Sequence, residues 1–408
     1  MGLIVPREAL LFAETPGRMS RREVLHLFGS SMLAGGFSFA RRAERWLPDT
    51  IDEAVAQAEE RLFVPSIVRS LSLEKKIAQL IVVLPEGVLG SGVCYWVNEE
   101  LWEALCELPI GGVLLKDVHF VDPEQVRELT DGLQQCSQYG CGLPMLISVD
   151  EEGGTVVRVS DKAAFGVEDP GSMRYLGETG NVELAESEAF RVGSYLRDLG
   201  VNLDYAPVAD VTSDTTSFVY KRSFGGDADL VADMVAAQVR GFNASGTLCS
   251  PKHFPGIGEA KGDSHVESIY LDKSLDELWS HELKPFAAAV EAGAPLVMVG
   301  HMTCNALDAS RPACLSHAVV TDVLRDGLGF DGVVITDSLG MAAVNELYSP
   351  YEVGVLALEA GCDILLCPVD WRACVEGIMD AVQSGRLSEE RIDESVERIV
   401  RMKLTLGS

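Results

Sequence analysis

The sequence predicts an α/β protein that folds as a single (β/α)₈ barrel. Eight short apolar runs recur along the chain, and helix-like segments separate them. Such alternation implies parallel strands joined by crossover helices. Eight units in about 320 residues fit a closed barrel. The first run is not followed by the Gly-x-Gly-x-x-Gly turn of a doubly wound open sheet, which also favours the barrel.

The expected strands are short runs rich in Val, Ile and Leu, and they span 80–84, 112–116, 145–150, 201–210, 247–254, 296–302, 333–337 and 363–368. Helical patterns span 123–136, 184–199, 228–242, 274–292, 318–328, 352–359 and 373–384. An amphipathic helix over 388–406 closes the chain. Ser274 and Glu277 have the spacing of a capping box, which predicts a helix start there.

The first forty residues have the pattern of an export signal. Arg21 and Arg22 precede a modestly apolar, glycine-rich run that ends in a Ser-x-Ala pattern at Ala40. The run is too short and too rich in Gly for a membrane-spanning helix. We interpret residues 1–40 as a twin-arginine signal, with Met19 as an alternative start and an amphipathic N-terminal helix as the competing interpretation.

The signal predicts where the protein acts. The twin-arginine translocase would be a partner during export, and the protein would work in the cell envelope, in the periplasm or outside the cell. The charged, helical pattern of residues 41–70 indicates a lead-in, and residues 71–408 would form the barrel with its closing helix.

Composition excludes some classes of partner. The chain has 62 acidic against 33 basic residues, a net charge of −29. Nucleic acid is therefore not an expected partner, because its recognition relies on a basic surface. No spacing of the ten Cys and seven His is typical of zinc, so we expect no metal or other cofactor. A chain of this length can fold without disulfides, and the one bridge we considered joins Cys136 and Cys141.

Polar residues stand where the expected strands end. Because the carboxyl ends of barrel strands meet at one rim, these residues should converge on one site. A single strand-end Asp can cap the next helix, and a single Arg can pair with it. Agreement among five strands favours a site instead. The residues are Asp150, Asp210, Lys252, His253, His301 and Asp337.

Three chemistries could use this rim. A metal-dependent hydrolase of the amidohydrolase type needs a His-x-His pair after the first strand, where this chain has Leu84-Pro85-Glu86. A glycan-binding barrel without catalysis would tolerate loss of its nucleophile or acid, yet candidates for both are present. Retaining glycoside hydrolysis needs one carboxylate that attacks and a second group that protonates the leaving oxygen.

The stretch from Lys252 to His265 resembles the Lys-His-Phe-Pro-Gly-(His)-Gly…Asp-Ser-His signature of glycoside hydrolase family 3, in its β-N-acetylglucosaminidase (β-N-acetylhexosaminidase) branch. The resemblance extends over residues 71–385. Ile257 replaces the usual His, and Glu259 replaces a frequent Asp. Further motifs agree in order and type: Asp150–Gly154 with Arg158, Arg222–Gly225, Pro312–Ser316 and Leu328–Asp337.

The resemblance implies a role for each site residue. Asp337 would be the nucleophile that forms a covalent glycosyl intermediate. His265, oriented by Asp263, would be the general acid and base, which suits a group that titrates near neutrality. The terminal sugar would be held by Asp150, Arg158, Arg222, Lys252 and His253, and His301 and Met341 would belong to the same pocket.

The resemblance also implies a substrate. Family members that act as β-glucosidases carry their acid on a further domain, for which the 71 residues after Asp337 leave no room. We therefore expect release of terminal β-linked N-acetylglucosamine from muropeptides or chitooligosaccharides. A β-glucosidase and a glycoside phosphorylase of the same family are the alternatives.

Overall fold

The computed structural model describes residues 63–90, 92–258, 260 and 269–407. The predicted export signal and residues 41–62 of the lead-in lie outside this part, as do Glu259, Asp263 and His265. Residues 63–70 are helical, as the lead-in pattern predicts. The chain divides into two compact units, Met1–Ile67 and Val68–Ser408, and the second unit contains the barrel.

The predicted barrel is confirmed. Each of the eight predicted runs contains a strand: β1 (Ile81–Val83), β2 (Gly112–Leu114), β3 (Leu146–Val149), β4 (Leu203–Asp204), β5 (Leu248–Cys249), β7 (Leu296–Val299), β9 (Val333–Thr336) and β10 (Leu365–Leu366). Six of them form one parallel sheet in the order β10-β1-β2-β3-β4-β5, and β7 pairs in parallel with β9. Parallel bridges from Phe254 to Val299 and from Ile335 to Ile364 join the two sheets, so the ring closes.

The strands lie in the buried core of the barrel unit. Every residue of the eight strands is buried. Continuous runs of Val, Ile and Leu are expected where helices cover one side of a parallel sheet and a packed interior fills the other. A separate parallel pair, β6 (Tyr270–Leu271) with β8 (Thr303–Cys304), was not predicted, since neither strand lies in a Val-, Ile- and Leu-rich run of its own.

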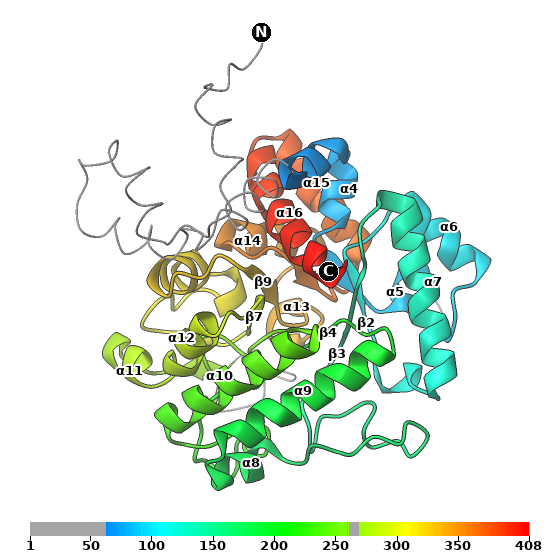
Figure 1. The fold of residues 1–408 in the computed structure, drawn as a ribbon. Helices are drawn as coiled ribbons and strands as arrows, with labels where there is room; N and C mark the ends of the chain where they lie inside the picture. The colour runs from blue at the N-terminus through cyan, green and yellow to red at the C-terminus, as the bar shows by residue number, and fades with distance from the viewer. Residues whose placement is uncertain (1–62, 91, 259, 261–268, 408) are drawn as a thin grey trace, which may run out of the picture. The chain divides into compact units, whose positions relative to one another are not determined.

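Helices surround the strands (Figure 1). Several of them begin at a side-chain cap. Asp122 before α7, Asp227 before α10 and Ser349 before α14 each accept a backbone N–H with the side chain. Figure 1 shows α9 and α10 side by side in the lower half of the view. The helices are α4 (Leu73–Ala78), α5 (Pro85–Leu89), α6 (Glu99–Glu107), α7 (Pro123–Cys141), α8 (Met173–Thr179), α9 (Val182–Asp198), α10 (Ala228–Ser245), α11 (Leu275–Ser280), α12 (Lys284–Glu291), the π-helix η5 (Ala318–Gly327), α13 (Ala342–Asn345), α14 (Pro350–Ala360), α15 (Trp371–Gln383) and α16 (Glu389–Leu404), with short 3₁₀ turns η3 (Asp117–His119), η4 (Ala313–Leu315) and η6 (Thr405–Gly407).

Two expectations about helices were wrong. The single helix expected over 274–292 is two helices, α11 and α12, because His281 leaves the helical region (φ −135°, ψ −77°) and Pro285, which lacks an N–H, sits in the first turn of α12. The capping box at Ser274 and Glu277 is present as predicted.

The helix expected over 123–136 continues to Cys141. Cys136 and Cys141 are both free thiols, so the bridge considered between them is not formed. Five positions apart on one continuous helix, their side chains leave in different directions.

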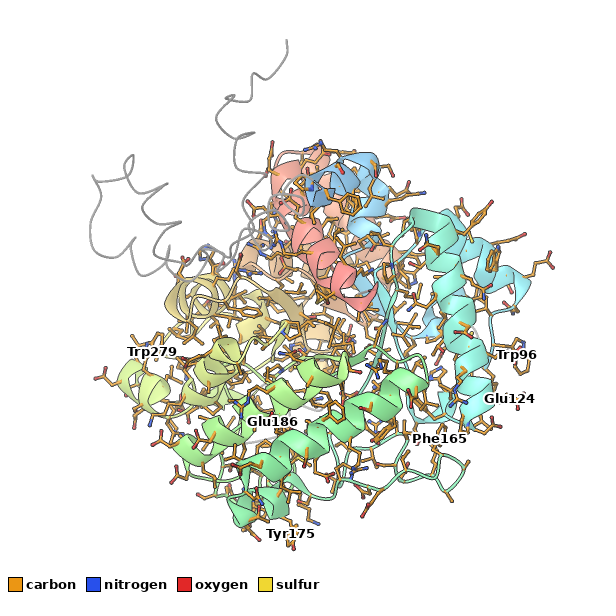
Figure 2. All side chains as sticks on the ribbon, in the orientation of Figure 1. Trp96, Glu124, Phe165, Tyr175, Glu186 and Trp279 are labelled. Carbon is orange, nitrogen blue, oxygen red and sulfur yellow. The ribbon has the colours of Figure 1, made fainter. Side chains whose placement is uncertain are left out.

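Large exposed aromatic residues lie at the surface of the barrel unit. Trp96, Tyr175 and Trp279 are 59%, 72% and 44% exposed, and Figure 2 shows them at the periphery of the view. Within the residues described, no helix combines the length and apolar character needed to cross a membrane.

A buried lysine lies at the amino ends of strands β1 and β2. Lys403 on α16 is fully buried, and its Nζ donates to Gln79 Oε1 and to the carbonyl of Gly111, each at 2.8 Å. Burial lowers the pKa of this lysine to about 8. An unfolded lysine titrates near 10.4, so the unfolded chain binds this proton more tightly. Stability therefore rises as pH increases from about 8 to about 10.4 and is lowest below that window.

We expect Lys403→Met to stabilise the protein by roughly 1–2 kcal/mol at pH 7. Removing the cost of a buried charge outweighs the loss of two hydrogen bonds. The gain should shrink as pH is raised toward 10, because the wild-type lysine then loses its proton. Urea unfolding of both proteins at pH 7 and pH 10 measures this. A stability difference that does not depend on pH would contradict the account.

Candidate functional site

A cavity of about 250 Å³ opens at the carboxyl ends of the barrel strands. Seven of the predicted site residues line it: Asp150, Arg158, Arg222, Lys252, His253, Asp337 and Met341. The other lining residues are Leu114, Lys116, Glu152, Val156, Phe218, Ile257, Met298, Ser338 and Leu366. Four of the six strand-end residues, Asp150, Lys252, His253 and Asp337, therefore meet in one pocket as predicted.

Glu152 is the centre of an ionic cluster in the cavity wall. It is 5% exposed and accepts two hydrogen bonds from Arg222, at 2.6 Å to Nε and 2.8 Å to Nη2. Its Oε1 lies 2.6 Å from Lys252 Nζ. Lys252 also donates to Asp150 Oδ1 at 2.7 Å. Two carboxylates and two cations thus hold one another in fixed positions, with charge-assisted hydrogen bonds between them.

The cluster keeps its members ionised. Burial alone would raise the pKa of Glu152, but the charges of Arg222 and Lys252 outweigh it and hold that pKa far below its usual range. Burial alone would lower the pKa of Lys252, yet Asp150 and Glu152 raise it. Lys252 and Arg222 therefore remain charged donors at neutral pH, suited to binding hydroxyl groups.

His253 is oriented by a buried carboxylate. Its Nδ1 lies 2.7 Å from Asp210 Oδ2, and its Nε2 lies 3.4 Å from Arg222 Nη2. Because Arg222 can only donate, Nε2 accepts and Nδ1 carries the hydrogen that goes to Asp210. The other oxygen of Asp210 accepts the N–H of Ile257 at 2.7 Å. Asp210 therefore fixes both the imidazole and the start of the loop that follows.

Glu151 holds the segment that begins at Arg158 through hydrogen bonds to its backbone. The carboxylate of Glu151 accepts the backbone N–H of Arg158, Val159 and Ser160, at 2.5, 3.0 and 2.9 Å. Tyr195 on α9 donates its hydroxyl to the same carboxylate at 2.8 Å. Glu151 thus turns away from the cavity and shapes the turn that presents Arg158.

Asp337 follows β9 and faces the cavity. Its backbone N–H donates to the carbonyl of Val299 on β7 at 2.8 Å, and its Oδ1 accepts the N–H of Ser338 at 2.7 Å. Burial alone would raise the pKa of Asp337. The neighbouring His301 and His253, the N–H of Ser338 and the charge of Lys252 outweigh burial and hold the pKa below its usual range. The carboxylate is therefore ionised at neutral pH, as a nucleophile must be.

His301 does not lie where the sequence placed it. Within the described part of the chain, the cavity lining does not include His301. His301 is 2% exposed, and its Nε2 lies 2.8 Å from the carbonyl of Ser338, the residue that follows Asp337. The sequence does not indicate whether a His at the end of a strand points into the pocket or beside it. Asp263 and His265, the expected acid/base pair, are not among the described residues.

Sequence reasoning gave no role to four residues of this site. Glu152 and Glu151 belong to the Asp-Glu-Glu run after β3, and side chains alternate in direction along an extended backbone. That alternation could have predicted that Asp150 and Glu152 share a side while Glu151 faces away. Asp210 was seen as a strand end without a role. Lys116 stands just after β2 and lines the cavity from an exposed position.

Ile257 occupies the position where the resembled signature usually has His. It is 2% exposed and contributes an apolar side chain to the cavity wall. The described residues contain no group of three or more His, Cys, Asp or Glu side chains placed to hold a metal ion.

A parallel barrel with a charged pocket at the carboxyl ends of its strands is the architecture of the (β/α)₈-barrel enzymes. Residues 72–402 match the Glycosyl hydrolase family 3 N terminal domain. The chain therefore belongs to glycoside hydrolase family 3.

Two curated relatives and one solved structure are similar to the chain. Beta-hexosaminidase A of Pseudoalteromonas piscicida is 32% identical over 75% of this chain and 55% of its own length. Beta-hexosaminidase LpqI of Mycobacterium tuberculosis is 34% identical over 82% of this chain and 83% of its own. The structure of a glycoside hydrolase family 3 beta-N-acetylglucosaminidase from Paenibacillus sp. strain FPU-7 has a TM-score of 0.77 and 36% identity, covering 83% of this chain and 63% of that one. The chain thus spans less than two thirds of the Pseudoalteromonas and Paenibacillus proteins.

Proposed function

We propose that this protein is a retaining exo-glycosidase that releases terminal β-linked N-acetylglucosamine. The observation that carries the proposal is the meeting of an ionised Asp337 with Asp150, Lys252 and Arg222 in one cavity of a family 3 barrel. The names of the similar proteins, beta-hexosaminidase and beta-N-acetylglucosaminidase, support the choice of sugar. The cavity lining includes the strand residues Leu114, Met298 and Leu366. The barrel strands thus border the cavity on one side, which suits a pocket that admits the end of a glycan.

In this proposal the reaction has two steps. The Asp337 carboxylate attacks the anomeric carbon, and the bond from that carbon to the leaving oxygen breaks as His265 gives the oxygen a proton. His265, now neutral, takes a proton from water, and the resulting hydroxide displaces Asp337 from the sugar. Two inversions at one carbon leave the product with the β configuration of the substrate.

The other residues would bind the sugar. Lys252 and Arg222 are charged donors, and Asp150 is an acceptor at the cavity wall. Hydrogen bonds between charged side chains and hydroxyls are roughly twice as strong as neutral ones. Each binding residue is already held by a buried partner, so little order has to be created when the sugar enters.

The choice of sugar is tested with two aryl glycosides. The wild-type protein is expected to hydrolyse an aryl β-N-acetylglucosaminide much faster than the matching β-glucoside. The two substrates share a leaving group and differ at C2, so the ratio of kcat/KM reports recognition of the acetamido group. Preference for the glucoside would reject the N-acetylglucosaminidase assignment, and turnover of neither would reject the proposed activity.

We expect His265→Ala to distinguish leaving groups. An imidazole that protonates the leaving oxygen matters most for alkyl or sugar leaving groups, and its loss should slow these by about 10²-fold or more. An aryl glycoside with an acidic phenol needs no proton in the first step and should be much less affected in that step. The measurement is single-turnover kinetics on both substrate types. Equal losses on both would show that another group is the acid.

The natural substrate is proposed from the export signal. A twin-arginine signal over residues 1–40 would carry the folded barrel to the cell envelope, where peptidoglycan fragments that end in N-acetylglucosamine occur. Fractionation of cells that express the wild type or an Arg21→Lys, Arg22→Lys double variant tests export. Activity confined to the cytoplasm in both would refute it. Assays of the purified enzyme on a disaccharide-peptide and on chitobiose would separate muropeptides from chitin fragments.

A further inference from the structure

The side chain of Cys314 lies against His301, behind the cavity. Its Sγ is 3.2 Å from His301 Nδ1 and is fully buried. The 3₁₀ turn η4, which carries Cys314, is fastened on both sides of the histidine: Cys314 N–H donates to the carbonyl of Gly300 at 3.1 Å, and Ala313 N–H donates to that of Met302 at 2.8 Å. The backbone therefore fixes thiol and imidazole against each other.

A second contact of the ring assigns the hydrogens. His301 Nε2 lies 2.8 Å from the carbonyl oxygen of Ser338, which can only accept, so Nε2 carries a hydrogen. In the neutral ring Nδ1 is then an acceptor, and the thiol of Cys314 is the donor to it. Burial raises the pKa of Cys314 well above its usual range, so the thiol has a proton to donate.

These contacts continue to Asp337. Ser338, whose carbonyl accepts from His301, donates its own N–H to Asp337 Oδ1 at 2.7 Å. The thiol of Cys314 and the ring of His301 thus lead to the carbonyl of Ser338, and the N–H of the same residue binds the Asp337 carboxylate. This carbonyl and this N–H belong to neighbouring peptide groups joined at the Cα of Ser338, so a shift of the carbonyl changes the backbone torsions of Ser338 and with them the direction of the N–H that orients Asp337.

We infer that Cys314 is a positioning residue: its thiol donates to Nδ1 and holds the His301 ring in place, and His301 in turn fixes the carbonyl of Ser338, the residue whose N–H orients the Asp337 carboxylate. The inference rests on the proposed role of Asp337 as nucleophile. It gives His301 a function behind the pocket instead of a contact with sugar. It also predicts that a hydroxyl can replace the thiol, because only a short donor at this position is required.

The test compares Cys314→Ala with Cys314→Ser, and Cys374→Ala is the matched control. Cys374 is also a buried free thiol, on α15, outside this set of hydrogen bonds. For an aryl β-N-acetylglucosaminide we expect Cys314→Ala to lower kcat about tenfold with KM changed less than about twofold, as for the loss of one orienting hydrogen bond. Cys314→Ser should stay within about threefold of the wild type. A kcat for Cys314→Ala equal to that of Cys374→Ala would overturn the inference.

A second measurement does not depend on activity. ¹⁵N NMR of histidine-labelled protein reports which ring nitrogen carries the hydrogen, and the loss of one signal in His301→Gln assigns the resonance. The Nε2–H form is expected in all three proteins, because the Ser338 carbonyl remains. The Nδ1 signal should have the position of a hydrogen-bonded acceptor in the wild type and in Cys314→Ser, and should shift to that of an acceptor without a donor in Cys314→Ala. If Cys314→Ala does not fold, Cys314→Val fills the space without a donor and should show the same shift.

The two proposals can fail separately. An Nδ1–H tautomer in the wild type, or an unchanged Nδ1 signal in the Ala or Val variant, would overturn the role of Cys314 whether or not the enzyme is active. A wild type that keeps the Nε2–H form but turns over no glycoside would instead count against the proposed function alone.

Discussion

Asp337→Ala is expected to lower kcat on an aryl β-N-acetylglucosaminide by at least about 10⁴-fold, because it removes the covalent route. The cavity and its ionic cluster should remain, since Asp337 takes no part in the bonds among Asp150, Glu152, Arg222 and Lys252. KM or inhibitor affinity should therefore change far less than kcat. Steady-state kinetics and binding of N-acetylglucosamine measure the two effects.

Asp331→Ala provides the matched control. Asp331 and Asp337 flank the same strand, β9, at opposite ends of the barrel, and Asp331 is exposed. Its carboxylate lies 3.5 Å from Arg398, a surface contact that contributes little. The control should keep nearly full kcat. An Asp337→Ala enzyme with more than about 1% of wild-type kcat would exclude Asp337 as the nucleophile.

Glu152→Ala is expected to reduce the free energy of unfolding by about 3–5 kcal/mol, because it leaves the charges of Arg222 and Lys252 buried without their shared carboxylate. Glu152→Gln keeps the shape and should lose less, since its oxygen can still accept. Both variants should also bind sugar poorly, because Arg222 and Lys252 lose the partner that holds them. Urea unfolding with far-UV circular dichroism measures the stability.

Asp150→Ala distinguishes the contributions of the two carboxylates of the cluster to stability. The Asp150 side chain is 18% exposed against 1% for Glu152, and Lys252 keeps Glu152 when Asp150 is removed. We therefore expect a stability loss of about 1 kcal/mol for Asp150→Ala. Similar losses in Glu152→Ala and Asp150→Ala would contradict the central place given to Glu152.

The barrel could be predicted because its strands are buried on both sides. Each strand reads as a short run of Val, Ile and Leu, and eight such runs alternate with helical patterns. The break between α11 and α12 was missed because residues 274–292 keep a helical spacing of apolar residues through His281. The β6 and β8 pair was missed because Tyr270–Leu271 and Thr303–Cys304 stand outside the apolar runs, whereas the equally short β4, β5 and β10 lie within them.

The site was predictable to the level of which strands contribute to it. Asp150, Lys252, His253 and Asp337 follow strands and meet in the cavity because parallel strands end at one rim. The order of strands does not determine which way each side chain turns after its strand ends. The direction of His301, whose Nε2 faces the Ser338 carbonyl, is a property of the local backbone, and only the structure gives it.

The most direct test of the proposed mechanism is the anomeric configuration of the first product. ¹H NMR during rapid hydrolysis of an aryl β-N-acetylglucosaminide distinguishes the two anomers of free N-acetylglucosamine before they interconvert. A glycosyl intermediate on Asp337 requires two inversions, so the β-anomer should appear first and the α-anomer should follow only by mutarotation. Initial release of the α-anomer would mean a single displacement by water and would contradict the covalent role of Asp337.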